Sequence, residues 1–584
     1  PATHLEVVGG TDYAQIQLTD TDSDNTVQRT GILSQHYDSD EQAIRIIGVY
    51  SDSSTTNVQI GGGSGDHNSA ELVQFFVSDD HTTLAGTIRM VIDSNSRISL
   101  SNNDDGASNT VFGYLAGAAL TTNGDNNVVI GDNAGNDLTT GDQNTIIGHQ
   151  AGDALVGGDD NTFIGQSAGG ATTAGTSMTI VGRNAGTGVL DTDAVGTVLV
   201  GFGSGAALTS GIGNVAIGYQ SLDAATDSDY NTAVGTSALG AVVSSGDGRN
   251  TAVGYNAGLA LNSGIKNTFV GALAGDAMTD GHENVIIGDN TGSVSTSVGY
   301  TVVIGQSAGA ADMTATADGT VAIGYSALGA LTSGTNNTAI GYQSLDANAT
   351  SDYNTALGYQ TLSAVNGDGS GSNTAVGYRA GYQITTGTFN TALGTSALYT
   401  NNQSDKNVAV GYAALYYTSA NTDGANVAVG NEAGFYNGTG QNNTYIGHNA
   451  GMGTTTANQS DNTAIGKDAL LNIQTAGNNV AIGTAAGDAV TSGGNHVLIG
   501  VGAGGNFDAE TDNVFIGYGC GSGAIAGADK CVAIGSSAFG GAATQDGTVA
   551  IGYQALDALT SGEGNTAVGY TAGTALTTGA RNLA

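Results

Sequence analysis

Residues that could perform catalysis or bind a metal are few in this sequence of 584 residues, and they follow no catalytic spacing. The eight His residues are scattered, and no H-E-x-x-H pair occurs. Acidic pairs such as Asp159–Asp160 fall in predicted turns, and none stands out as the carboxylate pair of a glycosidase. We therefore expect no enzymatic activity and no cofactor. Structural calcium stays an alternative, although the G-G-x-G-x-D repeat of calcium β-rolls does not recur.

The two cysteines, Cys520 and Cys531, lie close enough in sequence to occupy neighbouring turns of a repeat. A disulfide would require Cα atoms within about 7 Å and an oxidising compartment. The alternative is a pair of buried thiols. The sequence leaves both open.

Tyrosine is the most regularly placed residue type with binding potential. Eleven of the 23 Tyr residues follow a recurring aliphatic–Gly pair directly. In a stacked repeat they would form an interrupted stripe that either contacts a host glycan or stacks upon itself. These residues are Tyr114, Tyr219, Tyr255, Tyr325, Tyr342, Tyr359, Tyr378, Tyr412, Tyr518, Tyr553 and Tyr570.

The recurring Gly marks a repeat, N-T-A-[VI]-G-Y-x-A-[GL]-x-A-L-T-T-G-x-x, which occurs 27 times from Asn109 onward. Its period is 17 residues, and one or two extra residues in some copies fall between the anchor motifs, where turns are expected. Such a period predicts a β-solenoid or β-roll of 27 short rungs, because one rung cannot bury its own face but stacked rungs can. At about 4.8 Å per rung, the predicted rod is roughly 130 Å long.

Within each rung we assign the residue before the anchor Gly, and the residue two positions earlier, to the interior. The residue between them, mostly Ala but Phe163 or Phe269 in some copies, is assigned to a contact with a neighbouring chain in a parallel homotrimer. A second short strand is expected in the A-x-x-A-L part, as in Ala257–Leu261. The Gly of T-T-G, as in Leu331–Gly334, is expected to supply a positive φ.

The first position of the motif is Asn in most copies. Stacked rungs would align these side chains into a ladder of amide hydrogen bonds. The ladder includes Asn109, Asn231, Asn250, Asn267, Asn354 and Asn462.

The amino-acid composition limits what this chain can bind. Lys and Arg number 12 against 51 Asp and Glu, for a formal charge of −39, so nucleic acid is excluded as a partner. No apolar run approaches the ~20 residues of a membrane helix, so we expect no membrane insertion by this chain.

Residues 1–105 lack the repeat and are assigned to a small N-terminal β domain that caps or connects the rod of residues 106–584. Leu72–Val77 reads as a buried strand, and Arg89–Ile92 with Arg97–Leu100 as a hairpin.

The segment Gly86–Ser96, G-T-I-R-M-V-I-D-S-N-S, resembles the G-T-x-R-M-x-I-D-S-x-G segment of phage tail fibres. It departs from that pattern at Ser96, where the family usually has Gly, so a different turn is expected there. The repeats resemble the head repeats of trimeric autotransporter adhesins, with their S-V-A-I-G units. The resemblances imply an extracellular, homotrimeric fibre on a virion tail that joins other fibre proteins and attaches to a host glycan. The alternatives are a bacterial surface adhesin of the autotransporter type and a self-assembling extracellular filament.

Overall fold

The computed structural model describes the strands between residues 5 and 99, and residues 108–584 apart from 122, 244, 419–422, 455–457, 524–526 and 543. The chain forms two units, Pro1–Gly203 and Ser204–Ala584, which are described separately. The fold is an all-β parallel solenoid of about 26 turns of about 17 residues, as the repeat predicts.

The N-terminal strands pair antiparallel. β1 pairs with β2, β4 lies between β3 and β5, and β7 lies between β6 and β8. The predicted strand at Leu72–Val77 is β6, and the predicted hairpin is the pair β7–β8, so both strand predictions are confirmed. The burial of β6, the departure at Ser96 and the boundary at residue 105 lie outside the described residues. The strands are β1 Leu5–Gly9, β2 Ala14–Leu18, β3 Gln28–Ser34, β4 Ile44–Ser51, β5 Thr56–Ile60, β6 Leu72–Val77, β7 Thr87–Asp93 and β8 Ile98–Ser99.

In the first unit the repeat contributes one three-residue strand per rung, and consecutive strands pair parallel and in register. These strands are β9 Thr110–Phe112, β10 Val128–Ile130, β11 Thr145–Ile147, β12 Thr162–Ile164, β13 Thr179–Val181 and β14 Val198–Val200.

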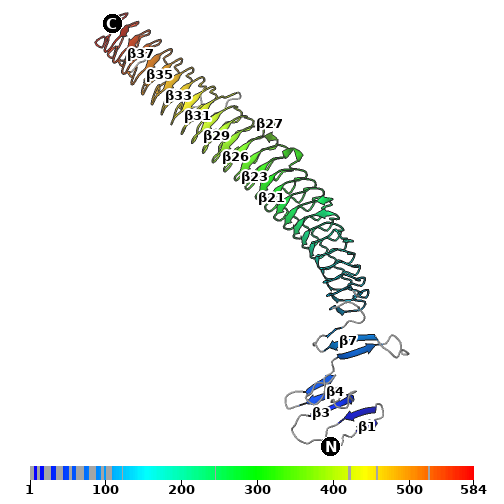
Figure 1. Cartoon of the computed structure of the whole chain (residues 1–584). Coiled ribbons are helices and arrows are strands. Elements are labelled where there is room, and N and C mark those ends of the chain that lie inside the picture. The colour runs from blue at the N-terminus through cyan, green and yellow to red at the C-terminus, as the bar shows by residue number, and fades with distance from the viewer. Residues whose placement is uncertain are drawn as a thin grey trace. The chain divides into compact units, whose positions relative to one another are not determined.

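The second unit repeats this arrangement, and Figure 1 shows its short strands stacked one after another along one side of the coil. Its rung strands are β15 Val215–Ile217, β17 Thr232–Val234, β19 Thr251–Val253, β20 Thr268–Val270, β21 Val285–Ile287, β22 Val302–Ile304, β23 Val321–Ile323, β24 Thr338–Ile340, β26 Thr355–Leu357, β28 Thr374–Val376, β29 Thr391–Leu393, β30 Val408–Val410, β31 Val427–Val429, β32 Thr444–Ile446, β33 Thr463–Ile465, β34 Val480–Ile482, β35 Val497–Ile499, β36 Val514–Ile516, β37 Val532–Ile534, β38 Val549–Ile551 and β39 Thr566–Val568.

Extra residues in the longer copies leave the sheet undisturbed. Thr232 of β17 pairs with Thr251 of β19 across a 19-residue interval, in the same register as the 17-residue copies. The insertions lie in the turns, as expected, where they form the short parallel pairs β16–β18 and β25–β27 or the 3-10 turn η1. Their bounds are β16 Ser228–Asp229, β18 Gly246–Asp247, β25 Ser351–Asp352, β27 Gly369–Ser370 and η1 Ala315–Ala317.

Positions in a rung are counted here from the anchor Gly at position 0, so that the strand covers −3 to −1 and the Asn is at −4. The inward residue of the strand is the middle one, at −2, which contradicts the assignment from sequence. Ala339 of β24 and Phe163 of β12 are fully buried, whereas both neighbours of each are only partly covered. The prediction was wrong because the residues at −3 and −1 are also apolar or β-branched, so alternation alone favoured neither face.

The expected second strand is also absent from the described residues. The A-x-x-A-L part forms consecutive turns, as in Ala257–Leu261. Its backbone nevertheless bonds along the axis: the Gly258 N–H donates to the Ala274 carbonyl at 2.9 Å, and the Ala260 N–H donates to the Asp276 carbonyl at 2.9 Å. This rung is therefore tied to the next one on both of its sides.

Residues with a left-handed backbone conformation occur at positions that the sequence did not indicate. Gly334, of T-S-G, does not have a left-handed φ, so that expectation was wrong. A Cβ there would lie 2.4 Å from the Ser351 carbonyl oxygen, so close stacking is what requires Gly. Non-Gly residues take the left-handed region instead: in one rung Asn336, Gln343 and Leu345 have φ of 54°, 50° and 51°.

The core is a narrow column in which positions −2 and +4 share one space. Every copy with a large residue at −2 has Gly at +4, and every copy with Leu or Phe at +4 has Ala at −2. The contacts explain this rule, since a Cβ on Gly275 would lie 2.5 Å from the Phe269 ring. Ala233 paired with Leu239 fills the same space in the opposite way. In rungs where both positions are small, as at Gly258, the large side chains Leu239 and Phe269 of the neighbouring rungs approach instead, so the column stays closely packed.

Candidate binding surface

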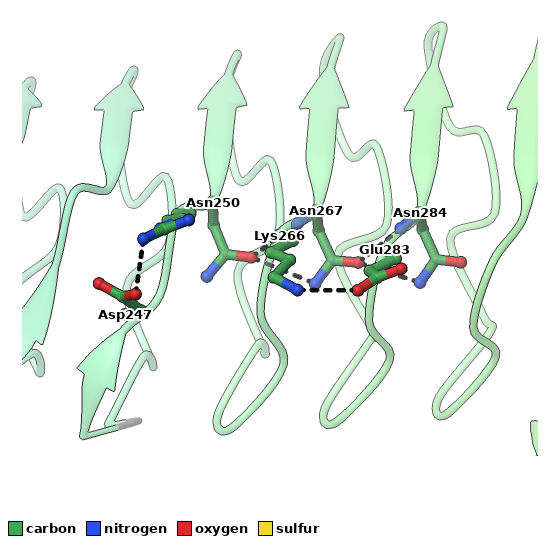
Figure 2. Close-up of polar contacts among 7 residues, drawn as sticks. Asp247, Asn250, Lys266, Asn267, Glu283 and Asn284 are labelled. Carbon is green, nitrogen blue, oxygen red and sulfur yellow. Dashed lines mark hydrogen bonds and ion pairs between the residues drawn. The ribbon is translucent and has the colours of Figure 1, made fainter.

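The Asn residues at −4 form a buried column of hydrogen bonds along the axis (Figure 2). The Asn267 backbone N–H and Nδ2 both donate to Asn250 Oδ1, at 2.9 and 3.2 Å, and Nδ2 also donates to the Gly281 carbonyl at 2.7 Å. Asn284 repeats the pattern on Asn267. Asn109, Asn231, Asn354 and Asn462 occupy equivalent places in their own units. Because these amides are enclosed and satisfied, the column stabilises the fold and presents nothing to a ligand.

A second axial column was missed in the sequence. Asp at −6 accepts a hydrogen bond from the backbone N–H of the equivalent residue one rung earlier, as Asp352 Oδ1 does from the Thr335 N–H at 2.8 Å. Asp229 and Asp405 do the same. The recurrence of Asp six residues before the anchor was the available signal, but other acidic residues in the same turns obscure it.

Charged pairs also run from rung to rung at this corner. Lys266 Nζ lies 2.9 Å from Glu283 Oε1 of the next rung, while Arg249 pairs with Asp247 within its own rung (Figure 2). These groups are roughly half exposed, so each pair adds little to stability.

Cys520 and Cys531 are both buried free thiols, and no disulfide joins them in this structure. Cys520 Sγ donates to the Ala533 carbonyl at 3.1 Å. Burial raises the pKa of Cys520 to about 12 and also raises the pKa of Cys531. Neither thiol is therefore poised as a nucleophile.

His496 takes the place of Asn at −4 and is fully buried. Its Nε2 lies 2.8 Å from the Glu510 carbonyl oxygen, and its Nδ1 accepts from the Asn513 N–H at 3.3 Å. The ring also stacks on Phe507, with centroids 5.0 Å apart. Burial lowers the pKa of His496, which suits the neutral tautomer that these bonds require.

The Tyr residues at +1 are exposed and, where they occur in consecutive rungs, they stack on one another. Tyr325, Tyr342, Tyr359 and Tyr378 form such a run, with successive ring centroids 5.2, 5.0 and 5.4 Å apart. All eleven predicted Tyr residues are at least 41% exposed. Self-stacking and exposure therefore occur together at this corner.

A further group of aromatic side chains, which the sequence did not single out, lies on the turns opposite the sheet. Tyr382, Tyr399, Tyr416 and Phe435 occupy +5 in consecutive rungs, with successive centroids 5.2, 4.8 and 5.0 Å apart. Burial raises the pKa of Tyr416. The signal was present in the sequence, because no other copy has an aromatic residue at +5.

Among the described residues, no three His, Cys, Asp or Glu side chains gather closely enough to hold a metal ion. Within the same residues, no helix has the length and apolarity needed to cross a membrane.

We compared the chain with protein-family models, curated proteins and solved structures, and none of them matches it. Its own geometry supports one classification. The chain is a β-solenoid repeat protein whose fold is consistent with a structural or adhesive role.

Proposed function

We propose that the chain is a non-catalytic, extracellular fibre on a virion tail, where it acts as a stiff spacer and as part of the host-attachment apparatus. The axial continuity of the rungs carries this proposal. Within each unit, successive rungs are bonded through the sheet and, in most copies, through the Asn column, so bending or pulling loads many parallel hydrogen bonds at once. The tail-fibre-like segment, which lies largely in β7, favours a virion over other extracellular settings.

We further propose that parallel copies associate as a homotrimer through the outer face of the solenoid sheet. The Ala and Phe residues that were expected to make this contact are inside the rung. The outer face instead presents the side chains at −3 and −1, among them Val253, Leu357 and Leu393, which are 38–46% exposed. A continuous aliphatic strip is unusual on an isolated soluble chain and typical of an interface.

Immunogold labelling of purified virions and of host cells tests the location. The proposal expects label on the tail. Label confined to a bacterial surface would instead support the adhesin of the autotransporter type. End-to-end filaments of the isolated chain would support a self-assembling filament.

A further inference from the structure

Four consecutive rungs depart from the repeat on the same face. Position +5 is aromatic at Tyr382, Tyr399, Tyr416 and Phe435, and +6 is aromatic only at Tyr417 and Tyr436, where most copies have Ala. We call these six residues the aromatic platform. Other rungs fold with Gly, Ser or Asp at +5, so the fold itself does not require large rings here.

The backbone holds the rings of the platform at rung spacing. The Gln383 N–H donates to the Tyr399 carbonyl, and the Thr400 N–H donates to the Tyr416 carbonyl, both at 3.0 Å. The rings of Tyr399 and Tyr416 are nearly parallel, at 5°, with centroids 4.8 Å apart. Tyr399 and Tyr416 each stack on a neighbouring ring on both sides, so the row of rings runs along the axis without a gap.

The +6 residues form the side of the platform. The ring of Tyr436 stands at 77° to that of Phe435, with centroids 4.6 Å apart, and Tyr417 and Tyr436 are parallel to each other. All six rings are only partly buried. The platform is therefore partly exposed to solvent, and five of its six side chains carry a phenol hydroxyl group.

Arg379 lies at one end of the platform. Its Cζ is 5.2 Å from the ring centroids of both Tyr378 and Tyr382, and its Nε donates to Gln360 Oε1 at 3.0 Å. None of the ion pairs among the described residues involves Arg379, although the protein is strongly acidic. The guanidinium is thus oriented by its neighbours without being neutralised by a carboxylate.

We propose that the aromatic platform and Arg379 bind an extended carbohydrate chain laid along the solenoid axis. Sugar rings present C–H faces that pack on aromatic rings, and their hydroxyls pair with phenol and guanidinium groups. An extended β-linked hexose chain advances per sugar by a distance close to the rung spacing, so successive sugars meet successive rings. The inference rests on the adhesive role proposed above and specifies where that role is performed.

The test is calorimetric titration of the full chain with two probes, neutral β-linked hexose oligomers and uronic-acid oligomers. The variant is Tyr399→Ser with Tyr416→Ser, since Ser293 and Ser363 occupy +5 in rungs that fold. The matched control is Tyr353→Asn, which removes an exposed Tyr at −5, where other rungs have Asn.

We expect the double variant to weaken binding by about tenfold or more, and the control to leave it unchanged. Arg379→Gln should weaken the uronic-acid probe more than the neutral one. No binding of either probe, or equal binding by the double variant, would overturn the inference. A changed oligomer mass in the double variant would also overturn it, because the platform would then be a contact between copies. If antibodies label the tail but the chain binds neither glycan, the fibre proposal stands and only this binding site is refuted.

Discussion

A single buried side chain, His496, makes the hydrogen-bond column sensitive to pH. Burial lowers its pKa below the ordinary value of 6.5, so the unfolded chain binds a proton more readily than the folded chain. The stability that His496 contributes is present above pH 6.5 and is lost as pH falls through its folded pKa. Protonation would place a proton on Nδ1, which accepts the Asn513 N–H.

We expect His496→Asn, which restores the common residue of the column, to remove this local sensitivity. Hydrogen exchange of residues 479–513, corrected for the intrinsic pH effect, should show faster local opening of the parent at pH 5 than at pH 8. The variant should show the same opening at both. An unchanged parent would contradict the prediction.

Asp346, at +5, gives the opposite dependence of stability on pH. Burial raises its pKa, and its Oδ1 is enclosed without a hydrogen-bond partner. The raised pKa means that its contribution to stability is fully present below the unfolded pKa of about 3.9 and is lost as pH rises through the folded value.

Asp346→Asn should therefore stabilise the rung at pH 7, by up to about 1 kcal/mol because the group is still partly solvated, and should give no gain at pH 3. Thermal unfolding at the two pH values measures this. Asp289→Asn, which removes the same charge from an exposed site, is the matched control, and an equal gain from it would refute the role of burial.

At the scale of the rung, the space shared by the side chains at −2 and +4 leads to a prediction for a double substitution. Phe269→Ala should leave a cavity costing about 3–5 kcal/mol, and Gly275→Leu alone should overpack at a cost of about 1–3 kcal/mol. Combined, they recreate the Ala–Leu pair of other rungs. Leu fits the backbone there, because Gly275 has φ of 57° and Leu239 adopts 51°.

The double variant should therefore be more stable than Phe269→Ala alone. Hydrogen exchange around β20 measures the local opening energy and avoids the assumption that a long repeat array unfolds in two states. Phe269→Ala with Gly309→Leu, in a distant rung, is the control. Rescue by that distant pair, or none by Gly275→Leu, would contradict the shared-space account.

At the scale of the whole molecule, the proposed homotrimer makes a prediction about the outer sheet face. Leu357→Lys with Leu393→Lys should convert the proposed trimer to monomer, because buried unpaired cations oppose association, while circular dichroism stays that of the parent. Sedimentation at several concentrations measures the mass. Asn336→Lys adds a cation at a corner position where other rungs have Lys266 and Lys406, and should leave the trimer intact. A parent that sediments as a monomer would refute the homotrimer.

Much of this architecture could be predicted from residue types alone. The period, the strand before each anchor Gly, the turn location of insertions and the alignment of Asn side chains all follow from spacing. The Asp column and the aromatic platform were equally periodic signals, yet each was hidden: the Asp column by neighbouring turn acids, and the platform because only four rungs carry it. The sequence also shows that a large residue at −2 goes with Gly at +4, and that Leu or Phe at +4 goes with Ala at −2. The reason became clear only from the side-chain contacts in the structure.

The sequence by itself determined the rung and its repetition, because period and register depend on local spacing that any stacked structure must respect. The tertiary structure alone decided which strand face turns inward. A three-residue strand such as Thr338–Ile340 has nonpolar groups on both faces, so its orientation depends on where the return turns of the same rung lie. Those turns carry Leu331 and its equivalents, which are buried as Ala339 is, so the core closes on that side of the strand and the aliphatic strip stays outside.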